Sequence, residues 1–280
     1  MTKVFEYFDS KWGKAFYRIS EALHTYSPEW VEWVNSESNS EINIIHEVGG
    51  GEIKPIQDSL DNKKKTIIVQ HTYFTSGYDQ WDSLWEKANL TISFHDLPTY
   101  TNKKFNFYAT PWGYEPSIFY DKNLNKTNPI FVTGHVANTE HIDDVYSACK
   151  FLGITMLHTG EDFKWGKYYK FLPYMDSNTF ANLLNTVFYT SCLRDIEGFE
   201  MAGVEGLACG ALPIVLDLPT YRWYKGFGIF IDSKKDIIEQ LVDIFINKPS
   251  IDIQQDKIKE TFAWNNIINE LFYKIQEYTN

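Results

Sequence analysis

The most informative segment of the chain is Glu197–Val215, which reads EGFEMAGVEGLACGALPIV. An acid, Glu197, precedes a glycine on a loop that follows an apolar run, and the pattern predicts a helix over about 202–209. A second acid, Glu205, falls in the first turn of that helix. A glycine ends the helix, and the apolar run 212–216 predicts a strand. The segment therefore indicates strand, loop, helix and strand of a parallel α/β sheet.

This loop and the helix start have the features of a site for a diphosphate and its neighbouring hydroxyl groups. Gly198 allows the backbone to approach a ligand closely, because glycine has no side chain. The helix N-terminus offers N–H groups and the positive end of the helix dipole to an anion. Glu197 and Glu205 are eight residues apart and could hold hydroxyl groups on either side of the phosphate. A second interpretation stays open, in which Glu197 is a surface acid and Glu205 only interacts with the helix dipole.

Short apolar runs alternate with helical patterns along the rest of the chain. The patterns predict strands over 4–8, 42–48, 65–70, 91–95, 105–109, 129–134, 154–158, 187–190 and 212–216. They predict helices over 15–26, 141–152, 180–184, 202–209 and 267–278. Two successive β/α alternations, separated by the polar stretch 121–128, indicate two doubly wound parallel domains. Ligands of such sheets bind at the carboxyl ends of the strands, so the cleft between the two domains is the expected site.

Composition and charge exclude several classes of protein. The 280 residues include 44% apolar residues, which is enough for a core, and carry a net charge of −11, which disfavours a general nucleic-acid binder. The three cysteines (Cys149, Cys192 and Cys209) imply no disulfide framework and form no zinc motif. The sequence has neither a signal peptide nor an apolar run long enough to span a membrane, so we expect a cytoplasmic protein.

The segment Glu197–Val215 resembles the E-x7-E signature of the retaining glycosyltransferases of the GT-B fold, the large family 4 group. Three more segments are similar to family motifs in the same order. Thr110–Phe119 (TPWGYEPSIF) resembles the turn that closes the N-terminal domain, and Phe131–His135 (FVTGH) resembles the first strand of the donor domain. Phe262–Asn265 (FAWN) resembles the closing F-S-W segment, whose helix returns to the first domain.

The resemblance implies the α/β GT-B architecture, in which two Rossmann-like doubly wound domains face each other across a cleft. Residues 1–124 would form the N-terminal acceptor-side domain. Residues 125–262 would form the C-terminal domain that binds the nucleotide-sugar, and 263–280 would be a helix that crosses back to the N-terminal domain. The implied activity is transfer of a hexose from a UDP- or GDP-sugar to a hydroxyl acceptor with retention of configuration and without a metal. The nucleotide-sugar would be a co-substrate, so no resident cofactor is expected.

The resemblance also implies roles for individual positions. Glu205 would bind the ribose hydroxyls, and Glu197 would contact hydroxyls of the transferred sugar. The Gly198 loop and the backbone N–H groups of Phe199, Glu200 and Met201 would also contact the donor. Gly13 would face the diphosphate, and His71 would approach the sugar. Tyr174 and Met175 would lie at the base.

We also predict that some aromatic residues of the N-terminal half are acceptor platforms, with core packing as the alternative. These residues are Trp12, Tyr73, Phe74, Trp81, Trp85 and Trp112.

Two departures from the family pattern bear on the diphosphate. The family usually has glycine where this chain has Glu200. Its phosphate clamp is an arginine and a lysine at positions that hold His135 and Glu140 here. Charge on the leaving diphosphate needs a cation in a site without metal. We predict that Arg194 replaces the clamp with help from His135; the alternative is that Arg194 pairs with Asp195 or an exposed acid.

Other chemistries find little support in the sequence. No D-x-D, G-x-G-x-x-G, G-x-S-x-G or P-loop motif is present, which argues against a metal-dependent GT-A enzyme, a dehydrogenase, a hydrolase and a P-loop NTPase. Two alternatives to a transferase stay open: a catalytically silent nucleotide-sugar binding module and a GT-B epimerase. The acceptor, a glycan, a lipid or a hydroxylated DNA base, is also open, although the net charge disfavours modified DNA.

Overall fold

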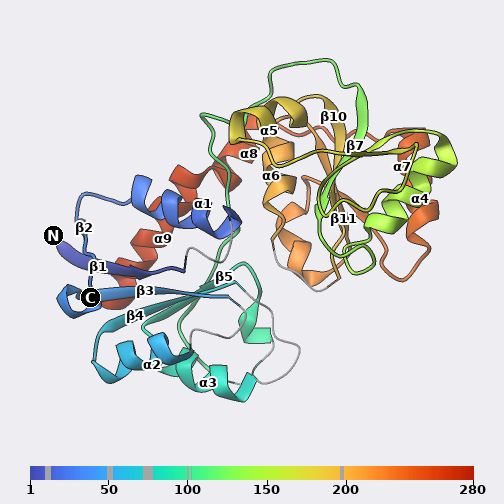
Figure 1. Ribbon diagram of the computed structural model, residues 1–280. Helices are drawn as coiled ribbons and strands as arrows, with labels where there is room; N and C mark the ends of the chain where they lie inside the picture. The colour runs from blue at the N-terminus through green and yellow to red at the C-terminus, as the bar shows by residue number, and fades with distance from the viewer. Residues whose placement is uncertain (10–13, 49–52, 72–77, 100, 102, 196–198) are drawn as a thin grey trace. The chain divides into compact units, whose positions relative to one another are not determined.

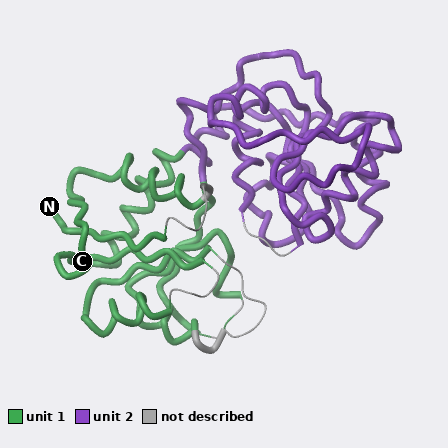
Figure 2. Tube along the Cα trace, in the orientation of Figure 1, with its two compact units in different colours: residues 1–112, 264–280 green, residues 113–263 purple. Residues whose placement is uncertain are grey.

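The computed structural model describes residues 1–9, 14–48, 53–71, 78–99, 101, 103–195 and 199–280. The chain divides into two compact units, coloured separately in Figure 2. Unit 1 comprises Met1–Trp112 and Trp264–Asn280, and unit 2 comprises Gly113–Ala263. Unit 2 thus begins ahead of the predicted boundary at residue 125, and the C-terminal helix belongs to unit 1.

Unit 1 is built on a six-stranded parallel sheet in the order β2-β1-β3-β4-β5-β6. Figure 1 shows α1 and α9 on one face of the sheet and α2 and α3 on the other. The elements of unit 1 are β1 (Thr2–Tyr7), α1 (Lys14–Thr25), β2 (Val31–Trp33), η2 (Glu37–Asn39), β3 (Ile42–Glu47), α2 (Ile53–Asp61), β4 (Lys65–Gln70), α3 (Tyr78–Lys87), β5 (Leu90–Ser93), η3 (Leu97–Thr99), β6 (Phe107–Ala109) and α9 (Trp264–Thr279).

Unit 2 is built on a second six-stranded parallel sheet, in the order β12-β11-β10-β7-β8-β9. Helices α4 and α7 pack together, and α6 packs with both α5 and α8. The elements of unit 2 are β7 (Asn128–Gly134), α4 (Ile142–Leu152), β8 (Met156–Gly160), β9 (Tyr169–Phe171), α5 (Ser177–Leu184), β10 (Val187–Cys192), α6 (Met201–Ala208), β11 (Leu212–Leu216), η4 (Pro219–Tyr224), β12 (Ile229–Ile231), α7 (Ile237–Asn247) and α8 (Gln255–Phe262).

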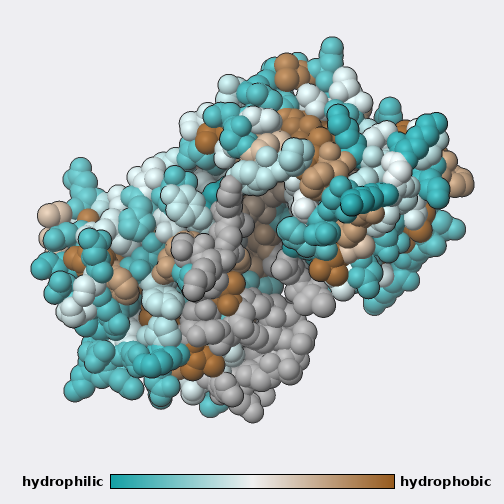
Figure 3. Space-filling view, viewed as in Figure 1, coloured by the Kyte–Doolittle hydropathy of each residue, from teal (hydrophilic) through white to brown (hydrophobic). Residues whose placement is uncertain are grey.

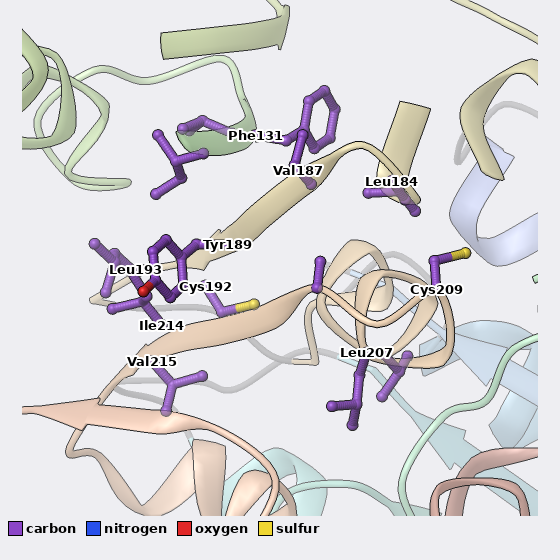
Figure 4. Packing of buried hydrophobic residues seen from close by; sticks show 14 of the residues in the cluster. Phe131, Leu184, Val187, Tyr189, Cys192, Leu193, Leu207, Cys209, Ile214 and Val215 are labelled. Carbon is purple, nitrogen blue, oxygen red and sulfur yellow. The ribbon is translucent and has the colours of Figure 1, made fainter. Parts of the chain in front are cut away.

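The predicted fold class, α/β with two Rossmann-like domains, is confirmed. The central strands β3 and β4 are rich in isoleucine because helices cover both of their faces, and every residue of β3 is buried, its polar residues included. Figure 4 shows part of the core of unit 2, where Tyr189 and Cys192 of β10 lie beside Ile214 and Val215 of β11. All three cysteines are free and buried in this unit.

Each sheet has one point at which the strand order reverses. In unit 1 the chain moves from β1 to β2 on one side and continues with β3 on the other, so the reversal lies between β1 and β3. In unit 2 the chain moves from β7 through β8 to β9 and then returns to β10, so the reversal lies between β7 and β10. The carboxyl ends of the strands at such a point are where open α/β sheets bind ligands.

Helix α6 packs very closely against the neighbouring strand β10. A Cβ atom on Gly203 would lie 2.5 Å from both Cys192 Sγ and Tyr224 Oη, and one on Gly206 would lie 2.5 Å from Thr190 Cγ2. These contacts fix the position of the first turn of α6 at the carboxyl end of β10.

Substitution of Gly206 by alanine is expected to destabilise the protein by about 1–3 kcal/mol, because the new methyl group overlaps Thr190. Alanine in place of glycine at an unobstructed helical position would instead stabilise by up to about 1 kcal/mol. Urea unfolding of Gly206→Ala measures the difference. The double variant Thr190→Ala/Gly206→Ala removes the overlapping methyl and should recover part of the loss; a stabilised single variant would contradict this packing.

The polar stretch 121–128, which separates the two predicted domains, is bonded into unit 2. The backbone N–H of Lys122 donates to Asn185 Oδ1 at 2.7 Å, and Asn185 Nδ2 donates to the carbonyl of Tyr120 at 3.1 Å. The chain passes between the units at 112–113 and at 263–264 instead. These two crossings are adjacent, because the N–H of Tyr114 donates to the carbonyl of Phe262 at 2.9 Å.

The surface of each unit is mostly polar in the view of Figure 3, with apolar residues scattered among charged ones. Within the described ranges, no helix combines the length and apolar character needed to cross a membrane.

Candidate functional site

The candidate site in unit 2 is formed by two loops at the point where its strand order reverses. One loop follows β7 and the other follows β10. They are joined by a hydrogen bond from the N–H of Asp195 to the carbonyl of Thr139 (3.1 Å) and by the contact of His141 Nε2 with Asp195 Oδ1 (3.1 Å). His135 and Glu140, which occupy the positions of the family's phosphate clamp, therefore lie next to the loop that carries Arg194.

The loop after β7 closes around the carboxylate of Glu140. Its Oε2 accepts hydrogen bonds from the backbone N–H groups of His135 (2.6 Å) and Val136 (2.8 Å). Gly134 has a φ of +151°, and a Cβ there would overlap Glu140 Oε2 at 2.2 Å. The carboxylate thus occupies backbone donors of the kind that bind phosphate oxygens in other loops. The side chain of His135 is exposed.

Arg194 lies between two carboxylates. Its Nη1 is 3.1 Å from Glu140 Oε1, and its Nε contacts Glu200 Oε1. Its backbone is held by buried Tyr221, whose Oη accepts from the N–H of Arg194 at 3.1 Å. Asp195, the partner in the alternative prediction, contacts His141. Arg194, predicted as the clamp substitute, therefore lies beside the start of α6 and is paired with two acids.

His141 gives the same loops a second ion pair. Its Nδ1 is 2.7 Å from Asp144 Oδ2, in addition to the contact with Asp195. Partial burial opposes the charged ring, but the hydrogen bonds and charges of Asp144 and Asp195 prevail and raise the pKa of His141. A protonated His141 helps to hold the β7 and β10 loops together.

The start of α6 lies directly beside Arg194. Glu200 is the N-cap residue, it is 8% exposed, and its side chain makes no capping hydrogen bond. Its carbonyl accepts from buried Tyr224 Oη (2.6 Å), and the ring of Phe199 stacks on Tyr224 with centroids 5.6 Å apart. Met201, 7% exposed, opens the helix. These contacts fix the direction of the backbone N–H groups that the resemblance assigns to the donor.

The position of Glu205 corrects the prediction. The helix begins at Met201, so no acid lies in its first turn and Glu205 falls in the second. Glu205 therefore lies beyond the first turn, within which the helix dipole acts, and this argues against the alternative that it only interacts with the dipole. The residue is 1% exposed, so a ribose that Glu205 binds would have to reach a carboxylate that the protein encloses here.

Three of the predicted donor residues lie outside the described residues: Gly13, Glu197 and Gly198. Tyr174 and Met175 follow β9 in unit 2. Tyr174 is 65% exposed, and Met175 is half-buried and packs against the core of unit 2. Their contact with a base stays a prediction.

In unit 1, His71 lies at the carboxyl end of β4 and is 6% exposed. Burial lowers its pKa well below the ordinary value, and the neighbouring His46 and His95 lower the pKa further. His71 is therefore a neutral imidazole at neutral pH. Its ring contacts Phe16 and Trp112, with centroids 5.0 Å and 5.2 Å away.

The predicted aromatic acceptor platforms are buried wherever the structure describes them. Trp81, Trp85 and Trp112 are at most 3% exposed, and the first two belong to the core of unit 1. Their role is core packing, which was the alternative. Trp12, Tyr73 and Phe74 lie outside the described residues. Across the described ranges, no group of three or more His, Cys, Asp and Glu side chains could hold a metal ion.

Comparison with solved structures identifies the architecture. Sucrose-phosphate synthase from Thermosynechococcus elongatus matches with a TM-score of 0.69 at 13% identity, over 97% of this chain and 80% of that chain. AviGT4, a glycosyltransferase involved in avilamycin A biosynthesis, matches with a TM-score of 0.66 at 9% identity, over 100% and 98% of the two chains. The pneumococcal O-GlcNAc transferase GtfA in complex with UDP and GlcNAc matches with a TM-score of 0.64 at 16% identity, over 85% of this chain.

The chain has the GT-B fold. It spans little more than half of the GtfA structures, 57% of the matched chain in the GtfA/B complex and 56% of that in the complex with UDP and GlcNAc. No protein-family model matches the sequence, and no curated protein matches it either. At these identities the likeness shows the fold, and the chemistry depends on the residues of this chain.

Sequence reasoning missed two features of the GT-B units. It did not foresee that Glu200 pairs with Arg194, or that Glu140 fills the loop after β7. The sequence showed only that Glu140 and Glu200 stand where the family has a lysine and a glycine. A third feature that it missed is a buried polar chain in unit 1, which starts at Glu6 and reaches His71 through His46. The only signal there was a histidine among the isoleucines of the predicted strand.

Proposed function

We propose that this chain is a retaining, metal-independent glycosyltransferase that moves a hexose from a UDP- or GDP-sugar to a hydroxyl acceptor. The observation that carries the proposal is the position of Arg194 beside the start of α6, at the strand-order reversal of a GT-B donor unit. The structural neighbours also include a trehalose-phosphate synthase described as UDP-forming. The GtfA transferase described above is in complex with UDP and GlcNAc. Metal independence rests on the lack of a D-x-D motif in the sequence.

The donor would bind along the carboxyl ends of β7 and β10. Its diphosphate would meet the N–H groups at the start of α6 and the guanidinium of Arg194, which together stabilise its negative charge. Glu205 would hold the ribose, Glu197 the sugar hydroxyls, and the segment at Tyr174 the base. UDP is the donor nucleotide we favour, because the GtfA structure is a complex with UDP and a trehalose-phosphate synthase among the structural neighbours is described as UDP-forming.

Transfer would occur on one face of the sugar ring. The bond between the anomeric carbon and the diphosphate breaks, the bond to the acceptor oxygen forms on the same side, and configuration is retained. The protein contributes by positioning both groups and by stabilising the charge that develops on the diphosphate. The acceptor would be a glycan, a lipid or a hydroxylated DNA base; the net charge of −11 disfavours DNA.

A second candidate is a silent module that binds nucleotide-sugars without turnover. The observation that favours it is the pair of carboxylates, Glu140 and Glu200, that balance Arg194. A diphosphate must compete with these acids for the guanidinium. An active enzyme requires that the diphosphate displace at least one of them.

Incubation with a panel of nucleotide-sugars, with and without acceptors, tests the proposal. Nucleotide release that increases with a hydroxyl acceptor, together with a product of retained configuration, is the expected result. Binding without release would select the silent module. Nucleotide release without an acceptor, or an altered sugar in the recovered donor, would select an epimerase. Addition of EDTA should leave the transfer rate unchanged, and loss of activity would contradict metal independence.

A further inference from the structure

The loops after β7 and β10 in unit 2 are joined by two ion pairs between consecutive residues. Glu140 Oε1 lies 3.1 Å from Arg194 Nη1. The residues that follow them form the second pair, in which His141 Nε2 lies 3.1 Å from Asp195 Oδ1. The backbone N–H of Asp195 adds another link, because it donates to the carbonyl of Thr139 at 3.1 Å. Both side chains and backbone therefore tie residues 139–141 to residues 194–195.

Donor binding affects these links differently. Under the proposed function, the guanidinium of Arg194 binds the diphosphate, which requires that a carboxylate give up its place. The contact of His141 with Asp195 and the backbone hydrogen bond of Asp195 involve neither the guanidinium nor the acids that balance it. These links can therefore persist while the side chain of Arg194 changes its partner, and they hold the chain at the next residue.

The ring of His141 lies between two carboxylates. Its Nδ1 is 2.7 Å from Oδ2 of Asp144, which lies three residues further along the chain in α4. A neutral imidazole has a single N–H group and can donate to one carboxylate, so the two contacts together require the protonated ring. The side chain of Asp195 is 48% exposed, so solvent screens its contact with His141 and the backbone hydrogen bond must act together with it.

The backbone of His141 is left-handed, with a φ of 49° and a ψ of 28°, at the N-cap of α4. Its side chain makes no capping hydrogen bond there. Residues other than glycine rarely adopt this conformation, although histidine, asparagine and aspartate adopt it more readily than others. A side chain at such a position points to a role for that side chain. Asparagine is the replacement that the backbone tolerates best.

We propose that His141 and Asp195 are positioning residues, whose contact ties the loops after β7 and β10 together and keeps the backbone of Arg194 in place while its guanidinium exchanges a carboxylate for the diphosphate of the donor. The ligand in this statement rests on the proposed function. The contact itself belongs to the protein without ligand, and it can be measured there.

The charged groups around His141 come from the two loops and from the elements that pack against α4. Asp144 and Asp195 act on the charge of its ring, and Glu140 and Arg194 pair with each other. Asp143 accepts from the backbone N–H of Asp144 at 3.1 Å. Helix α7 packs against α4 and carries the exposed acids Glu239 and Asp243. Strand β8 also contacts α4, and burial lowers the pKa of its His158 to about 4, so that ring is neutral.

The contact should depend on pH. Partial burial opposes the charged form of His141, but Asp144 and Asp195 outweigh it and raise the pKa of His141 above the ordinary value of about 6.5. The contribution of the protonated ring is therefore fully present below about pH 6.5 and is lost as the pH rises through the raised pKa. The loops should be held together most firmly in mildly acidic solution.

NMR and hydrogen exchange of the full chain without ligand test the contact itself. The ring of His141 should titrate above about pH 6.5, and Asp195→Asn should lower its pKa. The backbone N–H of Asp195 should be protected from exchange, and its protection factor should fall by about 3- to 10-fold in His141→Asn at about pH 6. An ordinary or lowered pKa in the wild type, or equal protection in wild type and His141→Asn, would overturn the proposal.

Binding of UDP-glucose tests the effect on the donor. Its diphosphate is esterified at both ends, so its charge stays constant between about pH 6 and about pH 8.5. His141→Asn and Asp195→Asn are expected to raise its Kd by about 3- to 10-fold at the lower pH and by less at the higher pH, where the wild type has also lost the contact. Asp252→Asn removes an exposed acid of the same unit and should behave like the wild type.

The pH dependence separates positioning from a structural role. A Kd raised by the same factor at every pH, or one unchanged in both variants, would overturn the positioning role; melting curves of the variants show that they are folded. Failure of the proposed function gives a different result, because the wild type would bind neither UDP-glucose nor GDP-glucose. That result would overturn the link to the diphosphate, while NMR and hydrogen exchange would still decide whether His141 and Asp195 join the loops.

Discussion

Arg194→Gln is expected to lower kcat/KM for sugar transfer by about 100- to 1,000-fold. The chain has only three arginines, Arg18, Arg194 and Arg222, and Arg194 alone lies at the strand-order reversal of unit 2. In a site without metal, a guanidinium beside the helix start is the main cation for the leaving diphosphate. Glutamine keeps hydrogen-bonding capacity but has no charge, so the loss measures the charge. Steady-state rates of nucleotide release give the value.

Two variants control this experiment. Arg222 lies in η4 of the same unit, with its guanidinium 5.0 Å from the ring centroid of Trp223. Arg222→Gln therefore removes an equal charge from outside the loops after β7 and β10 and should keep the wild-type rate. Glu140→Gln removes one of the two acids that balance Arg194 and should lower the KM for the donor. Equal rates for Arg194→Gln and Arg222→Gln would refute the clamp.

Glu197→Gln is expected to lower kcat by about 100- to 1,000-fold with little change in the Kd of UDP. The resemblance places Glu197 at the hydroxyls of the transferred sugar, so its carboxylate should act on the sugar and not on the nucleotide. Glu239→Gln, an exposed acid on α7, is the matched control and should behave like the wild type. Rates of transfer and of donor hydrolysis, measured with UDP titrations on the same preparations, separate the two effects. Wild-type turnover in Glu197→Gln would count against the E-x7-E assignment.

Much of the fold was predictable because the central strands are long and apolar. The strands around His46 in β3 and Thr190 in β10 were predicted with small errors at their ends, as were α1, α4 and α6. The strands that were missed are β2, β9 and β12, each three residues long. All three lie at sheet edges, where one side lacks a neighbouring strand and an apolar run is not required. Such short segments contain too few residues to show a period.

The candidate site was predictable only in part, because its key contacts join segments far apart in the sequence. Spacing indicated Arg194 as a cation near the diphosphate, but not its pairing with Glu140, since that pairing depends on the adjacency of β7 and β10. The link between Glu6 and His71 likewise depends on the order β1-β3-β4 in the sheet. The exact start of the helix decided the third case, because α6 begins at Met201 and Glu205 therefore falls in its second turn and not in its first.

Calorimetric titration of UDP and of a UDP-sugar into the wild type, Arg194→Gln and Glu205→Gln tests most directly whether unit 2 binds a nucleotide-sugar at the ends of β7 and β10. We expect saturable binding of one nucleotide per chain to the wild type and weaker binding to both variants, since Arg194 would contact the diphosphate and Glu205 the ribose. Nucleotide binding of equal strength to all three proteins, or none to the wild type, would contradict it.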